Sequence, residues 1–221
     1  MKNTLETLSS GSLGDKVFEI LEQQILNGTY AVGDQLVESK ISAELGVSRT
    51  PVREALRQLE LDNLVTTIQN KGCFVVGIST DDIKDIYTIR IAIEGICAMW
   101  AAERITPEQA RELENLVELQ EFYSAKNEIL QIVQLDTKFH EIIYDISGSR
   151  TLRNTLHSFH VHVKRARESS FFSAGRTRAA VEEHRELFEA ISSKNGQLAK
   201  TLMEKHITNA RDNILSIIES K

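Results

Sequence analysis

The chain has 221 residues, which is enough for one large domain or two compact ones. Hydrophobic residues make up 41% and charged residues 26%, as in globular proteins, so collagen, coiled-coil and linker classes are excluded. The formal net charge of -6 excludes a broad basic surface that binds any polyanion, so a contact with nucleic acid must be local.

Residue usage also bears on fold class and compartment. With only 2 prolines and 11 glycines, the chain is poorly suited to a loop-rich β protein, and helix is favoured. Cys73 and Cys97 lie far apart, so neither a disulfide framework nor a cysteine zinc site is expected. The first ten residues do not resemble a signal peptide, and no apolar stretch approaches the roughly 18 residues of a membrane span. We expect a cytoplasmic protein without membrane contact.

Three helices are predicted in the first part of the chain. Apolar spacing, the stop signals Asn27-Gly28 and Gly46, and a start at Thr50 define them. Thr50 is expected to cap the third helix, with Pro51 at its first helical position, where a missing N–H costs nothing. The predicted ranges are about 12–27, 38–45 and 50–63.

A β-hairpin follows the third predicted helix. Residues 64–68 and 73–76 are rich in β-branched and aromatic side chains, and the segment Gln69-Asn70-Lys71-Gly72 between them is typical of a turn. The order helix, helix, short turn, helix, hairpin predicts a winged helix-turn-helix.

The rest of the chain predicts long helices only. A start signal at residues 79–82 marks their beginning, so we divide the chain into domains 1–78 and 79–221. The predicted fold class is mainly α, with an N-terminal winged helix-turn-helix followed by an all-α six-helix bundle. The predicted bundle helices are about 80–104, 107–125, 128–147, 150–171, 177–193 and 197–219.

Several motifs carry a resemblance to a known family. Residues 45–56 (LGVSRTPVREAL), Leu59-Glu60 and the Lys71-Gly72-Cys73-Phe74-Val75 wing resemble GntR-type bacterial transcription regulators. The second half resembles the FCD ligand-binding domain of the FadR subfamily. The motifs that resemble it are Asp85-Ile86-Tyr87-Thr88-Ile89-Arg90 with Glu94, Asp136-Thr137-Lys138-Phe139-His140, Glu183-His184 and Lys205-His206-Ile207. Six helices would place the domain nearer the VanR-like branch.

The third helix carries a cationic stripe that suits a DNA major groove. Arg49, Arg53 and Arg57 recur every four residues, and an arginine fork can pair with guanine O6 and N7 or with a phosphate. The alternative is a solvated helix face on which Glu54 and Glu60 pair with these arginines. The resemblance favours DNA contact, although Ser39 stands where family members often carry arginine. The predicted DNA-contacting residues are Arg49, Thr50, Arg53, Arg57, Lys71 and Gly72.

The charge of the first 78 residues predicts how DNA is bound. Four Lys and three Arg stand against three Asp and seven Glu, so this half has a charge of -3 and nonspecific affinity should be weak. Binding must then rest on two copies of a concentrated patch, which predicts a homodimer on palindromic double-stranded operator DNA.

Four residues of the helical half predict a metal site. Asp136 and His140 are four apart on one helix, and His184 and His206 are equidistant from the turn at Asn195 of a predicted helical hairpin. One carboxylate and three imidazoles suit a divalent Zn, Ni, Mn or Fe ion. A buried histidine without a metal is the alternative. His157, His160 and His162 are interpreted as surface or cavity-lining residues.

Arg90 and Glu94 lie one turn apart on the first bundle helix and share a face with apolar residues. The resemblance implies that Arg90 faces a cavity and binds the carboxylate of a small organic-acid effector, and we assign Glu94 to the same site. The alternative is an internal Arg90–Glu94 ion pair. The sequence favours a ligand-responsive transcription regulator, expected to be a repressor, and the competing hypothesis is a metal-dependent enzyme built on a helical bundle.

Overall fold

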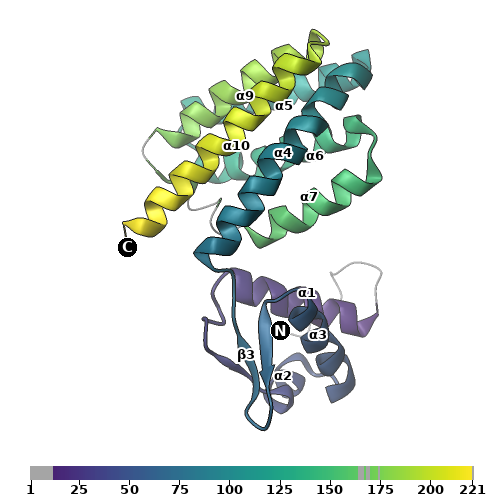
Figure 1. Cartoon of the computed structure of the whole chain (residues 1–221), viewed down its shortest axis with the longest axis vertical. Coiled ribbons are helices and arrows are strands. Elements are labelled where there is room, and N and C mark those ends of the chain that lie inside the picture. Colours follow the sequence, from purple (N-terminus) through teal and green to yellow (C-terminus); the bar gives the residue numbers. More distant parts are fainter. Residues whose placement is uncertain (1–11, 164–166, 168–169, 174, 221) are drawn as a thin grey trace. The chain divides into compact units, whose positions relative to one another are not determined.

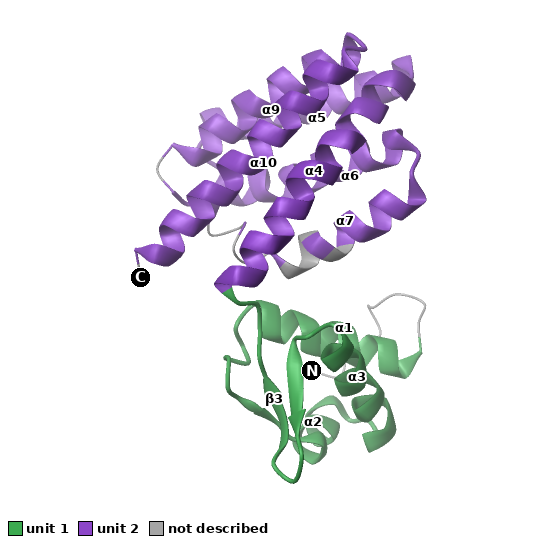
Figure 2. Cartoon of the chain, in the orientation of Figure 1, with its two compact units in different colours: residues 1–79 green, residues 80–221 purple. Residues whose placement is uncertain are grey.

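The computed structural model describes residues 12–163, 167, 170–173 and 175–220. The chain forms two compact units, residues 1–79 and residues 80–221 (Figure 2). Each unit is described by itself below.

The first unit is a helix-turn-helix with a small sheet, as the sequence predicts. Helix α3 packs against α1 and α2 (Figure 1). Along the chain β1 lies between α1 and α2, and β2 and β3 follow α3. The helices are α1 (Leu13–Leu26), α2 (Glu38–Leu45) and α3 (Arg49–Leu61), and the strands are β1 (Gln35–Leu36), β2 (Val65–Ile68) and β3 (Gly72–Val75). Val17, Leu21, Val52 and Leu59 are fully or almost fully buried and form part of its core.

The start of α3 differs from the prediction. The helix begins at Arg49 with Ser48 as its N-cap residue, so Thr50 lies inside the first turn and does not cap it. Pro51 is the third helical residue, which is compatible with a helix because the first four N–H groups have no intrahelical acceptor. The first turn therefore tolerates proline at several positions, and proline alone does not fix where a helix begins.

The sheet has one strand more than predicted. Its order is β1-β3-β2, all antiparallel, with Gln35 opposite Phe74 and Val65 opposite Val75. The predicted hairpin corresponds to β2 and β3. Two residues are too few to produce a recognisable alternation, which is why β1 could not be predicted. At the wing, Gly72 has a φ of 108°, a conformation that favours glycine.

The second unit is all-helical in its described residues. Figure 1 shows α4 and α10 running side by side, and α9 is the antiparallel neighbour of α10. A Cβ atom at Gly95 of α4 would lie 2.8 Å from Glu204 Cγ of α10, so this glycine permits the close approach of the two helices. The helices are α4 (Thr80–Arg104), α5 (Pro107–Ala125), α6 (Ile129–Ser147), α7 (Arg150–His162), α9 (Arg176–Ser192) and α10 (Gly196–Glu219).

The predicted single helix 150–171 is wrong. Helix α7 ends at His162, the buried Val163 lies in a turn, and Arg167, Ser170 and Phe171 are helical again. The segment contains neither glycine nor proline, so the sequence has no local stop signal there. Arg167, which follows the end of α7, is buried and forms an ion pair with Asp136 of α6. The structural difference from the prediction therefore coincides with a tertiary contact and not with a local sequence signal.

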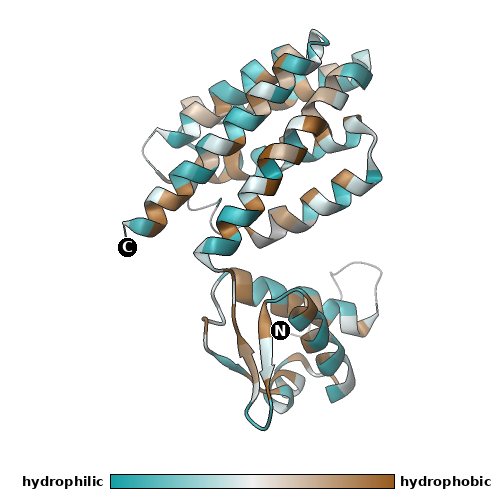
Figure 3. Cartoon of the chain, viewed as in Figure 1, coloured by the Kyte–Doolittle hydropathy of each residue, from teal (hydrophilic) through white to brown (hydrophobic). Residues whose placement is uncertain are grey.

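The core of the second unit is unusually polar. Hydrophobic and hydrophilic residues alternate along its helices in Figure 3, as expected for amphipathic helices. Several charged or polar side chains are nevertheless buried among them, and these are Arg90, Glu94, Gln120, Asp136, His140, Arg167, His184 and His206. Buried polar groups require partners, so this set identifies the region of interest. Within the described part of the chain, every helix is too short or too polar to cross a membrane.

A capping box at the start of α5 gives a test of the helical unit. Thr106 Oγ1 accepts a hydrogen bond from the Gln109 N–H, and the Gln109 side chain accepts one from the Thr106 N–H. Thr106→Ala should lower the free energy of unfolding by about 1 kcal/mol, since one helix-terminal donor loses its acceptor. Urea denaturation measures the change. In Thr201→Ala, a control within α10, no cap is lost, and a comparable loss there would contradict the assignment.

Candidate metal centre and nucleic-acid interface

Asp136, His140, His184 and His206 converge in the core of the helical unit. Helix α6 supplies the first two, α9 supplies His184 and α10 supplies His206. None of the four is more than 3% exposed, and one ligand atom from each lies within 4.8 Å of the others. The sequence prediction of a four-residue cluster therefore agrees with the geometry.

The turn between α9 and α10 sets two of these histidines opposite each other. Asn195 caps α10 by accepting a hydrogen bond from the Leu198 N–H, so the chain reverses where the sequence places the turn. His184 and His206, eleven residues on either side, consequently face each other with their Nε2 atoms 3.4 Å apart.

The remaining distances fit a compact coordination site. Asp136 Oδ1 lies 3.6 Å from His184 Nε2 and 3.9 Å from His140 Nε2. Ligand atoms arranged as a tetrahedron about 2.1 Å from an ion lie roughly 3.4 Å apart, so small inward shifts are enough to bring these atoms into contact with one cation. The residues present could hold a divalent metal.

Each of the three imidazoles has a side-chain oxygen close to its outer nitrogen. His140 Nδ1 lies 2.9 Å from Glu94 Oε2, His184 Nδ1 lies 2.8 Å from Gln120 Oε1, and His206 Nδ1 lies 2.6 Å from Glu183 Oε2. An acceptor at Nδ1 stabilises the tautomer that carries its proton there and leaves the Nε2 lone pair directed inward. The arrangement is that of metal-ligating histidines, whose outer nitrogen is almost always anchored.

The anchors are themselves held. Both Nη groups of Arg176 donate hydrogen bonds to the Glu183 carboxylate, and the side-chain amide of Asn209 donates a further one at 2.7 Å. Burial by itself would raise the pKa of Glu183, but the hydrogen bond from His206 and the nearby positive charge outweigh it and lower the pKa to about 2. Glu183 therefore stays ionised as the acceptor behind His206.

Burial disfavours the charged form of two of these histidines. Desolvation, followed by the proximity of the other histidines, lowers the pKa of His184 well below its usual value, and desolvation also lowers the pKa of His206. When both rings carry their proton at Nδ1, the two Nε2 lone pairs face each other at 3.4 Å and repel, and a cation between them would remove this repulsion. The donor set therefore fits a metal better than it fits a purely structural histidine cluster.

Arg90 and Glu94 form the internal ion pair that was the alternative interpretation. Arg90 Nε lies 2.6 Å from Glu94 Oε1, both side chains are buried, and the guanidinium also stacks over the Tyr87 ring. The second carboxylate oxygen of Glu94 faces His140, which makes Glu94 a link between the arginine and the cluster. Pairing does not remove Arg90 from the cavity, because Arg90 still contributes to its lining.

A cavity of about 10 Å³ adjoins the cluster. Arg90, Arg167 and Arg176 line it together with Asp136, His140 and His206, so its wall is rich in cations. Arg167 Nε lies 3.3 Å from the outer oxygen of Asp136. The volume corresponds to about one water molecule, so an organic acid could be accommodated only after these side chains move apart.

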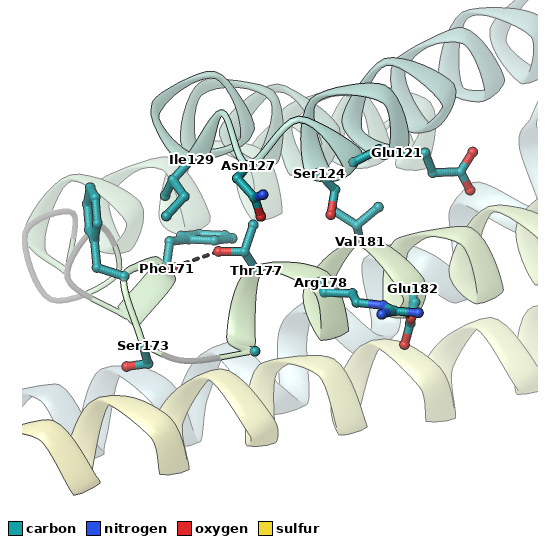
Figure 4. Close-up of a pocket in the computed structure, with 13 residues that line it drawn as sticks. Glu121, Ser124, Asn127, Ile129, Phe171, Ser173, Thr177, Arg178, Val181 and Glu182 are labelled. Carbon is teal, nitrogen blue, oxygen red and sulfur yellow. Dashed lines mark hydrogen bonds and ion pairs between the residues drawn. The ribbon is translucent and has the colours of Figure 1, made fainter.

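A more open groove of about 670 Å³ lies between the end of α5, the start of α6 and the start of α9 (Figure 4). Phe171 lines both this groove and the small cavity, and its carbonyl accepts a hydrogen bond from Thr177. Arg178 is the cation of the groove lining and is paired with Glu182 at 3.0 Å. The groove lining also contains Glu121 and Glu182, whereas three arginines and one aspartate line the cavity beside the cluster, so the cavity is better suited to an anion than the groove.

The predicted DNA-contacting residues lie on one exposed part of the first unit. Arg49, Thr50, Arg53 and Arg57 are exposed on α3, and Lys71 and Gly72 are exposed at the turn between β2 and β3. Pro51, Val52, Leu56 and Leu59 of the same helix are buried, so the cationic stripe and the core stripe lie on opposite sides, as predicted. The exposed Ser39 lies in the first turn of α2.

The ion pairs with Glu54 and Glu60 that the alternative interpretation predicted are not formed. The Thr67 N–H donates a hydrogen bond to Glu60 at 2.7 Å, and Glu54 packs beside Gly14. Among the described residues, Arg49 and Arg57 have no acidic partner within 4.0 Å. Arg53 instead contacts Glu38 at the start of α2.

Some supporting residues were not predicted from the sequence. Gln120 and Arg167 come from segments with no periodic or motif signal for a metal site, and Glu183 was noted only as the neighbour of His184. Among the other histidines, His157 is exposed as predicted, and the side chains of His160 and His162 lie outside the described residues.

Comparison with known proteins identifies both units. The model of bacterial regulatory proteins of the gntR family matches residues 13–75, and the FCD domain model matches residues 85–209. The HTH-type transcriptional regulator YdhC of Bacillus subtilis (strain 168) is 30% identical over 200 residues, covering 90% of this chain and 89% of that protein. The HTH-type transcriptional repressor RspR of Escherichia coli (strain K12) is 26% identical, covering 93% of this chain and 90% of the relative.

Solved structures share the same fold. E. coli McbR/YncC superposes with a TM-score of 0.74 at 22% identity over 95% of this chain and 100% of that chain. A GntR transcriptional regulator from Rhodococcus sp. RHA1 superposes with a TM-score of 0.68 at 25% identity, covering 93% of this chain and 99% of that chain. The family and its named members are regulators and not enzymes. The chain therefore belongs to the GntR family of bacterial regulators with an FCD domain, and it is a DNA-binding transcription regulator.

Proposed function

We propose that this protein is a ligand-responsive repressor that acts in the cytoplasm as a homodimer. Its domain of residues 1–78 binds palindromic operator DNA, and its domain of residues 79–221 binds a divalent metal and a small organic acid. The relative RspR carries the name of a repressor, which supports the direction of regulation.

The observation that carries the metal proposal is the arrangement of the three imidazoles. Each has a side-chain oxygen from a different helix beside Nδ1. His140 and His184 direct Nε2 toward Asp136, and the Nε2 of His206 faces that of His184. Asp136, His140, His184 and His206 would hold the ion, which could be Zn, Ni, Mn or Fe. A bound ion would supply a positive charge and open coordination positions for an oxygen ligand.

The cationic cavity supports an acid as effector. Arg90, Arg167 and Arg176 line it, and a guanidinium can pair with a carboxylate through two parallel hydrogen bonds. We assign Arg90 to the effector carboxylate, and we assign Glu94 to holding both Arg90 and His140 in place. Because the cavity is small, binding of the acid would displace side chains, and such displacement is a means of signalling.

DNA recognition gives the first test of the proposal. Replacing Arg49 or Arg53 by Ala should weaken binding of the operator by about 1 to 3 kcal/mol per half-site, because a direct contact to a base or phosphate is lost. Gel shifts at constant salt measure the effect. Arg111→Ala on α5, which removes the same charge from the other unit, should bind like the wild type. Equal affinity of all three variants would exclude α3 as the recognition helix.

Metal content gives the second test. His184→Ala and His206→Ala should each lose most of the bound metal, because three remaining ligands compete poorly with water. Elemental analysis of the monodisperse protein measures the metal per chain. His157→Ala, which changes an exposed histidine, should keep the full amount. If His184→Ala retains as much metal as His157→Ala, the four-residue site is wrong.

The effector arginine gives the third test. Arg90→Gln keeps a hydrogen-bond donor for Glu94 and should keep the metal, but it should weaken binding of the acid at least about tenfold because the charged fork is lost. Calorimetry with a panel of small mono-, di- and tricarboxylic acids identifies the acid that binds the wild type and compares the variants. Arg185→Gln, whose partner is Glu121 at the surface, is the matched control. Unchanged affinity in Arg90→Gln would remove Arg90 from the effector site.

A further inference from the structure

The interaction between Arg53 and Glu38 connects two helices of the first unit. Glu38 Oε2 lies 2.8 Å from Arg53 Nε, although both side chains are largely solvent-accessible, at 36% and 64% exposure. An acidic side chain beside an arginine that contacts DNA is unexpected on simple electrostatic grounds, because it brings a negative charge toward the phosphates. A favourable effect of Glu38 on DNA binding would therefore have to outweigh its repulsion of the phosphates.

The contact uses only one edge of the guanidinium. The carboxylate accepts the Nε hydrogen bond, and the two Nη groups of Arg53 have no hydrogen bond to any residue that the structure describes. The Nη edge has the fork geometry that pairs with guanine O6 and N7. Glu38 thus fixes the plane of the guanidinium while leaving its base-reading edge available.

The backbone around Glu38 is itself fixed. Glu38 is the first residue of α2 and follows β1, whose Leu36 is buried and pairs with Cys73 of β3. Together with Arg53, Arg57, Thr67 and Gly72, it lines a groove of about 400 Å³ between the recognition helix and the wing. A carboxylate held between a strand and a helix start can orient a flexible arginine at low entropic cost.

We propose that Glu38 is a positioning residue for base recognition, which orients Arg53 for a specific base in the operator. This inference rests on the proposed function of α3 as the recognition helix. The negative charge of Glu38 should then have opposite effects on specific and nonspecific DNA binding. Glu38 should strengthen binding to the correct sequence through Arg53 and weaken binding to any other duplex through repulsion from phosphate.

The experiment compares two duplexes of equal length at constant salt. One is selected from a random pool by the wild-type full-length protein, and the other has the same composition in scrambled order. Glu38→Gln should lower affinity for the selected duplex about five- to tenfold, while affinity for the scrambled duplex stays equal or rises. Glu44→Gln, which removes the same charge at the other end of α2, should lower neither affinity.

A double variant identifies the route of the effect. In Arg53→Ala, adding Glu38→Gln should cause no further loss on the selected duplex, because the group that Glu38 orients is absent. An equal loss in both backgrounds would overturn the positioning role. So would a Glu38→Gln protein that gains affinity for both duplexes. If Arg53→Ala itself binds the selected duplex normally, the recognition helix is wrong as well, which separates failure of the proposed function from failure of this inference.

Discussion

The helical unit depends on the compensation of ionisable groups in its core. A buried imidazole, carboxylate or guanidinium is costly unless hydrogen bonds and opposite charges replace the water that it loses. Here each buried histidine has a side-chain oxygen from another helix close to Nδ1, namely from Glu94 on α4, Gln120 on α5 and Glu183 on α9. The five helices α4, α5, α6, α9 and α10 are therefore linked through one polar centre as well as through their apolar faces.

The hydrogen bonds and ring contacts that compensate the buried groups also hold the histidine rings in fixed orientations. Glu183 accepts hydrogen bonds from Arg176, Asn209 and His206, and Phe139 stacks on the His184 ring with the ring centroids 3.9 Å apart. These contacts fix ring orientations before any ion binds, so binding would require little reorganisation. The small adjoining cavity has the opposite character, because its arginines must move to admit a ligand.

The sequence predicted the cluster because regular helix geometry links sequence spacing to position. Asp136 and His140 had to share a face, and the turn at Asn195 made His184 and His206 face each other. Gln120, Arg167 and β1 could not be predicted, since a single glutamine, an arginine beyond an unmarked helix break and a two-residue strand have no period. The pairing of Arg90 with Glu94 was one of two open interpretations, and distances were needed to describe it. Thr50 was misplaced as a cap because proline tolerates any position in the first helical turn.

Helix α4 has a mechanical consequence for communication within the chain. It runs without interruption from Thr80, the first residue of the helical unit, to Arg104, and it carries both Arg90 and Glu94. Arg90 lies ten residues from that beginning, or about 15 Å along the helix axis. A hydrogen-bonded helix resists compression and twisting, so a displacement of the helix at Arg90 also displaces the residue that is bonded directly to the DNA-binding unit. The backbone of α4 thus joins the polar centre covalently to the part of the protein that reads DNA.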